Sequence, residues 1–367
     1  MSRRFRMTTA LDVDDVLLEC IPYAIKLANE KYKFDPPLTI HEVDRWGKLG
    51  TRADVIFEFF TEEFFRSQPV IEGAKEFVHK LSQMTEVFIC TSVYPEFMSI
   101  RAEMIMREFP EIPPENIYMA SRKDKLNVDI LLDDGMHNVI KSNAAYPILM
   151  RRPWNQSATG MLAVNNYDEF LKLVEVISTS YSTIKDDYKN PSVVALVGPS
   201  GSGKSETAKI LLAKEPKFEK LLSYTTIDPT AKSKNDWYSY VDKNEFFNMV
   251  DSNELFQSTM YAGHGFGSKK SDVDKIIESG KTVLTIMDIC GAMSLKTNYK
   301  DVVTVYIKRD KRELLESILE KNSTNEDKVN RIISIDDERR NEEICDFVVE
   351  NNGNIEEIAN KIIELLF

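Results

Sequence analysis

The residues from Gly198 to Ser205 have the types and the spacing of a phosphate-binding loop. Gly198 is followed by four residues and then by Gly203, Lys204 and Ser205. In such a loop the backbone N–H groups surround a polyphosphate, the lysine adds charge at the β and γ phosphates, and the serine hydroxyl can bind Mg²⁺. An apolar segment, VVALV, precedes the loop and a helical one follows it. The predicted nucleotide-binding residues are Gly198, Ser200, Gly201, Ser202, Gly203, Lys204 and Ser205.

Three pairs of polar residues end apolar segments in the first half of the chain. They are Asp12 and Asp14, Thr91 and Ser92, and Asp133 and Asp134. Clustered carboxylates repel one another unless a cation neutralises them, and Mg²⁺ prefers oxygen ligands. One carboxylate can then attack phosphorus, while a second, partly protonated, serves the leaving oxygen. The spacing of Asp12 and Asp14 alone also fits a turn whose acids cap a helix.

Apolar and helical segments alternate along this half. Strands are expected at the start of residues 8–18 and within residues 86–92, 116–121, 128–134 and 145–150. Strands separated by helices imply a parallel sheet, whose ligands bind beyond the carboxyl ends of the strands. The three polar pairs should therefore meet at one edge of the sheet.

Length, composition and charge limit what the protein can be. A chain of 367 residues predicts two or three domains, and its 43% hydrophobic residues can fill separate cores. It contains no apolar run long enough to span a bilayer and its first residues lack a signal-peptide core, so we expect a cytoplasmic protein with no membrane partner. The net charge of -12 disfavours a nucleic-acid partner, because affinity for DNA rests largely on neutralising phosphates.

The domain boundaries follow from a change in composition. An amphipathic segment begins at Tyr167, and a polar stretch containing a proline follows it. We predict an α/β protein with a first domain over residues 1–178, a linker over 179–191 and a second domain over 192–367.

The motifs of the first half resemble those of the haloacid dehalogenase superfamily. DVDDV, EVFICTS and ILLDD carry the resemblance, and residues 7–155 as a whole, including FFRSQPVIEGAKEFVHKL, are similar to the 5′(3′)-deoxyribonucleotidases. The resemblance implies a parallel sheet with a small helical cap over residues 19–75 that selects the nucleotide. It implies Asp12 as the nucleophile, Asp14 as the general acid and base, and Thr91 as a phosphate ligand. The implied Mg²⁺ ligands are Asp12, Asp14 and Asp133.

Two details of that resemblance stay open. The family uses a lysine before its last motif, and the spacing from Asp133 favours Lys123, with Lys125 as the alternative. In the first motif Asp15 stands where many relatives have glycine, which leaves the tightness of that turn undecided.

The second half, residues 192–367, resembles the guanylate kinases. GPSGSGKS, SYTT, WYSY, NELFQ, GHGFGS, DICGA and VVENN follow the family's order. The resemblance implies a P-loop nucleoside monophosphate kinase, with ATP and Mg²⁺ on the loop, where Ser205 is the metal ligand. The acceptor would bind within residues 223–268, and a lid near 321–331 would bring Lys321 and Arg331 to the ATP. The implied substrate-binding residues are Tyr238, Gln257, Ser268 and Asp288.

The position of Asp288 suggests a role independently of the resemblance, because this residue ends the apolar segment KTVLTIMD. An acid at the end of a buried strand beside a phosphate loop can act on Mg²⁺ or on its water shell.

The second half departs from its family at the acceptor. Ile227 and Thr230 stand where the family has two arginines that hold the acceptor's phosphate, and Phe266 stands where a second tyrosine is expected. Neither Ile227 nor Thr230 can carry the charge of the arginine that it replaces. Lys232 and Lys234 are near enough in the chain to substitute, or the acceptor is held differently.

Gln257 takes the place of the glutamate that reads guanine in the family. A carboxylate accepts two hydrogen bonds, whereas an amide donates one and accepts one, which suits the N3–H and O4 edge of uracil or thymine. We therefore predict a deoxypyrimidine monophosphate acceptor, such as dUMP, dTMP or a 5-substituted relative.

The leading hypothesis is a bifunctional enzyme that uses Mg²⁺ and ATP and has nucleoside monophosphates as its small-molecule partners. One alternative is a polynucleotide kinase-phosphatase, which the acidic balance and the guanylate-kinase order of motifs disfavour. Another is a phosphatase fused to a non-catalytic binding module, which the intact loop disfavours. The sequence leaves open whether the chain is a monomer or a homo-oligomer.

Overall fold

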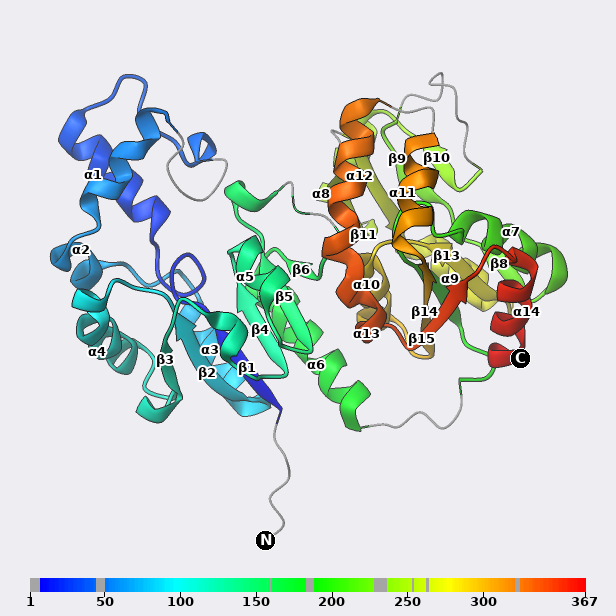
Figure 1. Ribbon diagram of the computed structural model, residues 1–367, viewed down its shortest axis with the longest axis horizontal. Helices are drawn as coiled ribbons and strands as arrows, with labels where there is room; N and C mark the ends of the chain where they lie inside the picture. The colour runs from blue at the N-terminus through cyan, green and yellow to red at the C-terminus, as the bar shows by residue number, and fades with distance from the viewer. Residues whose placement is uncertain are drawn as a thin grey trace, which may run out of the picture. The chain divides into compact units, whose positions relative to one another are not determined.

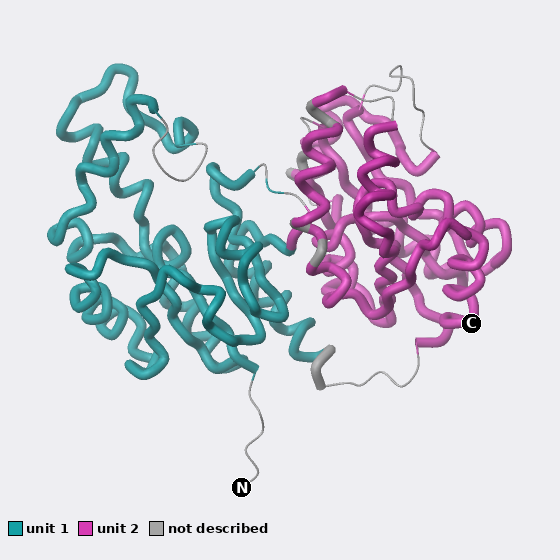
Figure 2. The backbone as a smooth tube through the Cα atoms, in the orientation of Figure 1, with its two compact units in different colours: residues 1–158, 162–179 teal, residues 159–161, 180–367 magenta. Residues whose placement is uncertain are grey.

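The computed structural model divides into two compact units (Figures 1 and 2). The structure describes residues 7–43, 50–156, 158, 160–182, 188–227, 236–252, 254–261, 264–320 and 324–367. One unit contains residues 1–158 and 162–179, and the other contains residues 159–161 and 180–367. Five predicted features lie outside the described residues, namely Thr230, Lys232, Lys234, Lys321 and part of the linker, 183–187.

The first unit is built on a six-stranded sheet in the order β3-β2-β1-β4-β5-β6. Every neighbouring pair is parallel, and Leu11 at the end of β1 lies opposite Ile89 on one side and Leu132 on the other. This register aligns the carboxyl ends of β1, β2 and β4. The strands are β1 Thr8–Leu11, β2 Glu86–Thr91, β3 Ile117–Met119, β4 Ile130–Asp133, β5 Tyr146–Met150 and β6 Ala163–Val164.

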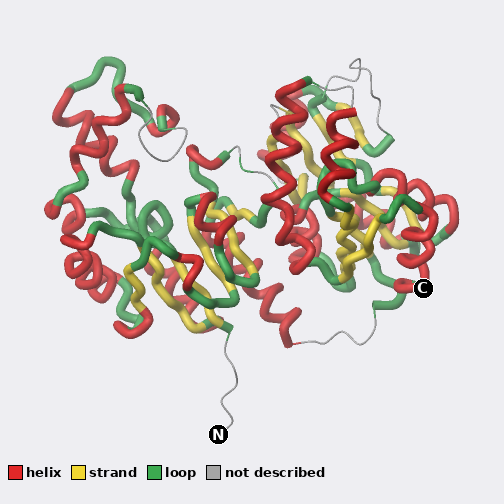
Figure 3. The backbone as a smooth tube through the Cα atoms, viewed as in Figure 1, coloured by secondary structure: helices red, strands yellow, loops and turns green. Residues whose placement is uncertain are grey.

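Helices flank this sheet, as the red segments beside the yellow strands show in Figure 3. They are α3 Ala74–Met84, α4 Met98–Glu108, α5 Met136–Lys141 and α6 Tyr167–Ser182. Short 3-10 helices lie in the connections: η3 Pro95–Phe97, η4 Pro114–Asn116, η5 Lys123–Lys125 and η6 Pro153–Asn155.

The segment between β1 and α3, predicted as the cap, contains helices whose side chains form most of one hydrophobic cluster, which Ile100 and Trp154 also join. Its aromatic side chains pack on one another, with Phe64 centred 5.2 Å from Tyr23 and 5.1 Å from Phe60. The helices are α1 Ile21–Tyr32, η1 Ile40–Glu42, η2 Arg52–Phe59 and α2 Glu62–Ser67.

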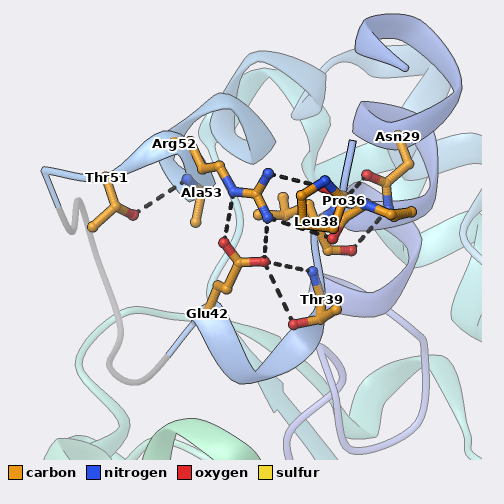
Figure 4. Close-up of polar contacts among 9 residues, drawn as sticks. Asn29, Pro36, Leu38, Thr39, Glu42, Thr51, Arg52 and Ala53 are labelled. Atoms are coloured by element: carbon orange, nitrogen blue, oxygen red, sulfur yellow. Dashed lines mark hydrogen bonds and ion pairs between the residues drawn. The ribbon is translucent and has the colours of Figure 1, made fainter. Parts of the chain in front are cut away.

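Polar contacts hold the loop that follows α1 in this segment (Figure 4). Arg52 donates to the two carboxylate oxygens of Glu42 at 2.7 and 2.8 Å and to the carbonyl of Pro36 at 2.9 Å. The Asn29 side chain accepts from the Leu38 N–H at 2.7 Å and donates to the Leu38 carbonyl at 2.8 Å. The loop is thus fixed to both α1 and η2.

The second unit contains a five-stranded parallel sheet in the order β15-β14-β7-β13-β8. All of β7 is buried, as expected for an apolar strand covered on both faces. The strands are β7 Val193–Val197, β8 Phe218–Lys220, β13 Thr282–Ile286, β14 Val302–Arg309 and β15 Phe347–Asn351.

A smaller mixed sheet in the order β10-β9-β12-β11 accompanies it. Its strands are β9 Ser223–Thr225, β10 Tyr238–Tyr240, β11 Leu255–Tyr261 and β12 His264–Lys269. The helices of this unit are α7 Lys204–Lys214, α8 Lys243–Asp251, α9 Lys270–Glu278, α10 Ile289–Asn298, α11 Lys311–Glu320, α12 Asn325–Asp337, η7 Glu338–Arg340, α13 Asn341–Ile344 and α14 Ile355–Leu366.

The two parallel sheets with their helices confirm the predicted α/β class. Among the helices that the structure describes, none combines the length and the apolar character needed to cross a membrane.

Candidate active sites

A buried lysine lies between two aspartates at the carboxyl ends of β1 and β4. The Lys123 ammonium, in η5, is 2.8 Å from Asp12 Oδ1 and 2.6 Å from Asp133 Oδ2. Asp12 directly follows β1, where its backbone N–H donates to the carbonyl of Leu132. The Val13 N–H also donates to Asp12 Oδ1, at 2.8 Å, so neither of these two contacts involves Oδ2.

A third carboxylate completes the cluster. Asp12, Asp133 and Asp134 each place a carboxylate oxygen within 4.8 Å of the others. Asp133 Oδ1 accepts from the Gly135 N–H at 2.8 Å and from Asn138 at 3.1 Å. Asp134 accepts from the indole N–H of Trp154 at 2.8 Å. These outer contacts orient the carboxylates in the way that partners of metal ligands do.

The charges at this cluster favour a bound cation. Burial raises the pKa of Asp12 to about 7, although the ion pair with Lys123 opposes that shift. Burial also raises the pKa of Asp134 well above its usual range. Burial opposes the charge of Lys123, but its two aspartate partners outweigh this effect and raise its pKa. Three carboxylates lie together and Lys123 pairs with two of them, so their buried oxygen donors fit the requirements of Mg²⁺.

The carboxylate of Asp14, a predicted metal ligand, lies elsewhere. Among the described residues, the clustered carboxylates are those of Asp12, Asp133 and Asp134. Asp14 instead accepts from Arg101 at 2.8 and 3.0 Å and from Gln68 at 2.9 Å. Sequence reasoning placed Asp134 at this edge of the sheet but did not include it among the predicted metal ligands, although its carboxylate lies in the cluster. Its signal was its position directly after Asp133.

The two candidate lysines differ sharply in environment. Lys123 is buried against Asp12 and Asp133, whereas Lys125 is exposed and its nearest acid is Asp124, at 3.5 Å. Thr91 is buried at the end of β2, and its hydroxyl has no hydrogen-bond partner in the part of the chain that the structure describes. A buried hydroxyl of this kind can donate a hydrogen bond to a ligand's oxygen without losing one of its own.

Asp15 accommodates the tight turn without glycine. Its φ of 54° is left-handed, a conformation that aspartate tolerates better than most residues. Its carboxylate accepts from the N–H of Cys20 at 2.9 Å and of Ile21 at 3.1 Å, at the start of α1. Burial raises the pKa of Asp15 to about 7, although these backbone hydrogen bonds lower it. The side chain thus stabilises the turn that follows Asp12.

In the second unit, the phosphate-binding loop joins β7 to α7. A Cβ on Gly198 would lie 2.6 Å from the carbonyl oxygen of Ile307, so only glycine fits there. Lys204 donates to two carbonyls at the start of the loop, those of Gly198 at 2.6 Å and Pro199 at 2.8 Å. Ser205 follows it, in the first turn of α7.

Side chains from distant elements hold this loop. Arg331, on α12, donates to the Ser200 hydroxyl at 2.7 Å. Arg309, at the end of β14, donates to the carbonyl of Gly201 at 2.8 Å, and Asn351, at the end of β15, donates to that of Ser202 at 2.7 Å. Neither Arg309 nor Asn351 was predicted as a site residue. Arg309 lies in none of the motifs identified in the sequence, whereas Asn351 lies in VVENN, which supported the resemblance but was given no role at the site.

The predicted acceptor residues gather on the mixed sheet. Gln257 on β11 lies directly opposite Ser268 on β12, and the Ser268 hydroxyl is 3.4 Å from that of Ser223 on β9. The rings of Tyr238 and Phe266 are centred 5.7 Å apart. The paired strands thus present an amide and a pair of hydroxyls beside two aromatic rings.

Two further predicted residues have local roles in the structure. Asp288 caps α10 by accepting from the Gly291 N–H at 2.8 Å. Ile227 directs its backbone N–H to the Thr225 hydroxyl at 3.3 Å, and its side chain can offer no charge to a phosphate.

Comparisons with known families match each half of the chain separately. Residues 6–180 match the family of 5′ nucleotidase, deoxy (pyrimidine), cytosolic type C proteins, and residues 190–367 match the guanylate kinase family. A 5′(3′)-deoxyribonucleotidase from Bacillus subtilis is 27% identical over 164 residues, covering 44% of this chain and 94% of that protein.

Guanylate kinases match the second half in the same way. The enzyme from Nostoc is 26% identical over 147 residues, covering 40% of this chain and 74% of its own, and that from Helicobacter pylori is 30% identical over 129 residues, covering 35% and 63%. A solved guanylate kinase from Anaplasma phagocytophilum covers 48% of this chain and 85% of its own, with 23% identity and a TM-score of 0.38.

Proposed function

Because the chain joins a deoxyribonucleotidase-type domain to a guanylate-kinase-type domain, we propose that it is a bifunctional deoxynucleotide enzyme. The first domain would be a Mg²⁺-dependent 5′-deoxyribonucleotide phosphatase. The second would be an ATP-dependent kinase for nucleoside monophosphates. The observation that carries the proposal is Lys123 between Asp12 and Asp133, a paired charge at the edge of a parallel sheet where ligands bind.

The phosphatase reaction follows from these side chains. Asp12 attacks phosphorus to form an aspartyl-phosphate, the bond from phosphorus to the ester oxygen breaks, and Asp14 gives that oxygen a proton. Water then attacks the phosphorus and passes a proton to Asp14, which releases phosphate and frees Asp12. The charge of Lys123 and the Thr91 hydroxyl hold the phosphoryl oxygens. Asp12, Asp133 and Asp134 would hold Mg²⁺, which supplies further positive charge against the phosphate.

The kinase half uses the loop of residues 198–205 to bind ATP phosphates. Lys204 and Arg331 supply charge where the transferred phosphoryl group becomes most negative, and Ser205 would hold Mg²⁺. Arg331 already contacts the loop through Ser200, which supports a role for α12 in closing over the nucleotide.

We propose a pyrimidine acceptor for this half rather than GMP. The amide of Gln257 can donate to O4 and accept from N3–H, and the adjacent Ser268 hydroxyl adds a second polar contact on the same pair of strands. At Ile227 the site lacks the cation with which guanylate kinases hold the acceptor's phosphate, so the phosphate of this acceptor would be held differently. Phe266 replaces a hydroxyl with an apolar ring edge, which suits an acceptor held by stacking.

The two proposed reactions run in opposite directions. On a single nucleotide they would only consume ATP, so we infer that the two halves prefer different bases. The protein would then remove one deoxynucleotide from a pool while phosphorylating another.

A product analysis tests the proposal. The full chain is incubated with each deoxynucleoside monophosphate and Mg²⁺, with and without ATP, and nucleoside is separated from diphosphate. Asp12→Asn should abolish only nucleoside formation, and Lys204→Ala only diphosphate formation. Strong preference for GMP would refute the pyrimidine assignment. Transfer of labelled phosphate to a 5′-hydroxyl oligonucleotide would instead support an enzyme acting on nucleic-acid ends.

A further inference from the structure

The carboxylate of Asp14 is held by two side chains that the proposed mechanism does not use. Arg101 Nη2 donates to Asp14 Oδ1 at 2.8 Å and to Oδ2 at 3.0 Å. Gln68 Nε2 donates to Oδ1 at 2.9 Å. Oδ1 therefore accepts two short hydrogen bonds, whereas Oδ2 accepts one longer bond.

The two donors come from different parts of the first unit. Arg101 lies on α4, beside the sheet, and its side chain is fully buried. Gln68 directly follows α2, at the end of the cap segment, and is also buried. Phe65, on α2, covers the guanidinium, with its ring centre 5.3 Å from Arg101 Cζ. The cap and the sheet thus meet on this one carboxylate.

This arrangement carries an energetic cost. Within the described part of the chain, Arg101 Nε, Arg101 Nη1 and Gln68 Oε1 are buried without a hydrogen-bond partner. Unsatisfied buried polar atoms are rare and destabilising, and a buried ion pair often contributes less to stability than apolar packing would. A purely structural role therefore explains the pair poorly.

We propose that Arg101 and Gln68 are positioning residues that fix Asp14 Oδ1 and so present Oδ2 to the ester oxygen of the substrate. In the first step the proton on Oδ2 goes to the leaving oxygen as the bond from Asp12 to phosphorus forms. In the second step Oδ2 takes a proton from the attacking water as that bond breaks. Throughout, Oδ1 keeps both of its hydrogen bonds. This inference rests on the proposed phosphatase function.

The test compares two substrates that differ in their need for an acid. A deoxynucleoside monophosphate has a poor leaving group and needs the proton from Asp14, whereas p-nitrophenyl phosphate has a good one. With Arg101→Met we expect kcat on the nucleotide to fall about 10²-fold, the order of loss for a misplaced catalytic group. On p-nitrophenyl phosphate the loss should stay within about tenfold, since acid catalysis contributes less there.

Further variants separate positioning from folding. Gln68→Leu keeps the Arg101 ion pair and should give a smaller loss with the same dependence on the leaving group. Arg101→Lys keeps the charge and should recover part of the nucleotide activity. Arg101→Met combined with Asp14→Asn should be no slower than Asp14→Asn alone. Arg66→Met is the matched control, because Arg66 lies on α2, two residues before Gln68, and pairs with Glu62 and Glu103 but not with Asp14.

The outcomes distinguish the inference from the function on which it rests. A wild-type chain inactive on both substrates would refute the phosphatase proposal. If the wild type is active, and Arg101→Met and Gln68→Leu each lower kcat on both substrates by the same factor, the positioning role alone would be refuted. Melting curves and the kinase activity of each variant show whether the chain is folded.

Discussion

The two candidate sites both lie at the carboxyl ends of parallel strands, but they offer different groups with which a phosphate could be bound. In the first unit, charged side chains do so: Lys123 contacts Asp12 at 2.8 Å and Asp133 at 2.6 Å. In the second unit, a continuous loop provides backbone N–H groups, and Lys204 donates to carbonyls of that same loop at 2.6 and 2.8 Å. One lysine joins distant segments, and the other stays within its own motif.

This difference predicts how each site depends on the rest of the fold. Lys123 neutralises buried carboxylates from two strands, so it contributes both to the stability of its unit and to the site. Lys204 is partly exposed and its loop is also held by Arg309, Asn351 and Arg331, so its charge should matter mainly once a nucleotide is bound.

The largest expected effect separates the two chemistries completely. Asp12→Asn removes the proposed nucleophile and should lower phosphatase kcat by about 10⁴-fold or more, as loss of a nucleophile does in other enzymes. Kinase kcat should be unchanged, because the loop of residues 198–205 belongs to the other unit. Steady-state assays of both activities on one preparation check this. Residual phosphatase activity above about one-tenth would show that Asp12 is not the nucleophile.

The next effect tests the contrast between the lysines. Lys123→Met leaves two buried carboxylates unpaired, which should cost about 3–5 kcal/mol of unfolding free energy as well as phosphatase activity. Lys204→Met should lower kinase kcat by about 10²- to 10³-fold with little change in melting. Lys125→Met is the matched control for the first variant, since that side chain is exposed. Equal destabilisation by Lys123→Met and Lys204→Met would contradict the contrast.

The same contrast explains what the sequence could predict. The loop of residues 198–205 is contiguous, so its residue types and spacing locate it without any tertiary information. Asp12 and Asp133 could be inferred because each ends an apolar strand, and such ends share one edge of a parallel sheet. The spacing from Asp133 favoured Lys123 over Lys125, but residue types could not decide between two lysines so close in the chain, because only packing makes one of them buried.

The groups that orient Asp14 could not be predicted. Arg101 is 87 residues away in the chain and Gln68 is 54 residues away, and neither belongs to a motif. An arginine on an amphipathic helix usually marks the solvent-exposed face, so its complete burial comes from the packing of α2 on α4. Likewise, the exchange of Asp14 for Asp134 in the carboxylate cluster depends on these contacts rather than on local sequence.

A smaller effect tests how the second site reads its acceptor. Gln257→Glu replaces a donor and an acceptor with two acceptors, and it should shift the ratio of kcat/KM values for GMP over dTMP about 10- to 100-fold toward GMP, as one base-edge contact can. Competition assays with both nucleotides measure the ratio. Ser258→Glu, on the next residue of the same strand, adds the same charge facing away from Ser268 and should leave the ratio unchanged. An unchanged ratio in Gln257→Glu would remove this residue from base recognition.

The smallest effect concerns the cap segment of the first unit, which lies outside both candidate sites' phosphate-binding groups. Arg52→Met should speed hydrogen exchange of the Thr39 N–H several-fold, because Thr39 donates to the Glu42 carboxylate that Arg52 holds. The Leu38 N–H, which donates to Asn29, is the internal control and should exchange as before. Hydrogen bonds from Arg52 lower the pKa of Glu42 from its ordinary value of 4.5 to about 2.

A carboxylate whose pKa is lowered in the folded state stabilises the fold at any pH above its ordinary pKa. That contribution is lost only as the pH falls toward the lowered pKa. The ratio of exchange rates between Arg52→Met and wild type should therefore be the same at pH 8 and pH 6, and it should shrink only in strong acid. A ratio that already falls between pH 8 and pH 6 would show that a group other than Glu42 holds this loop.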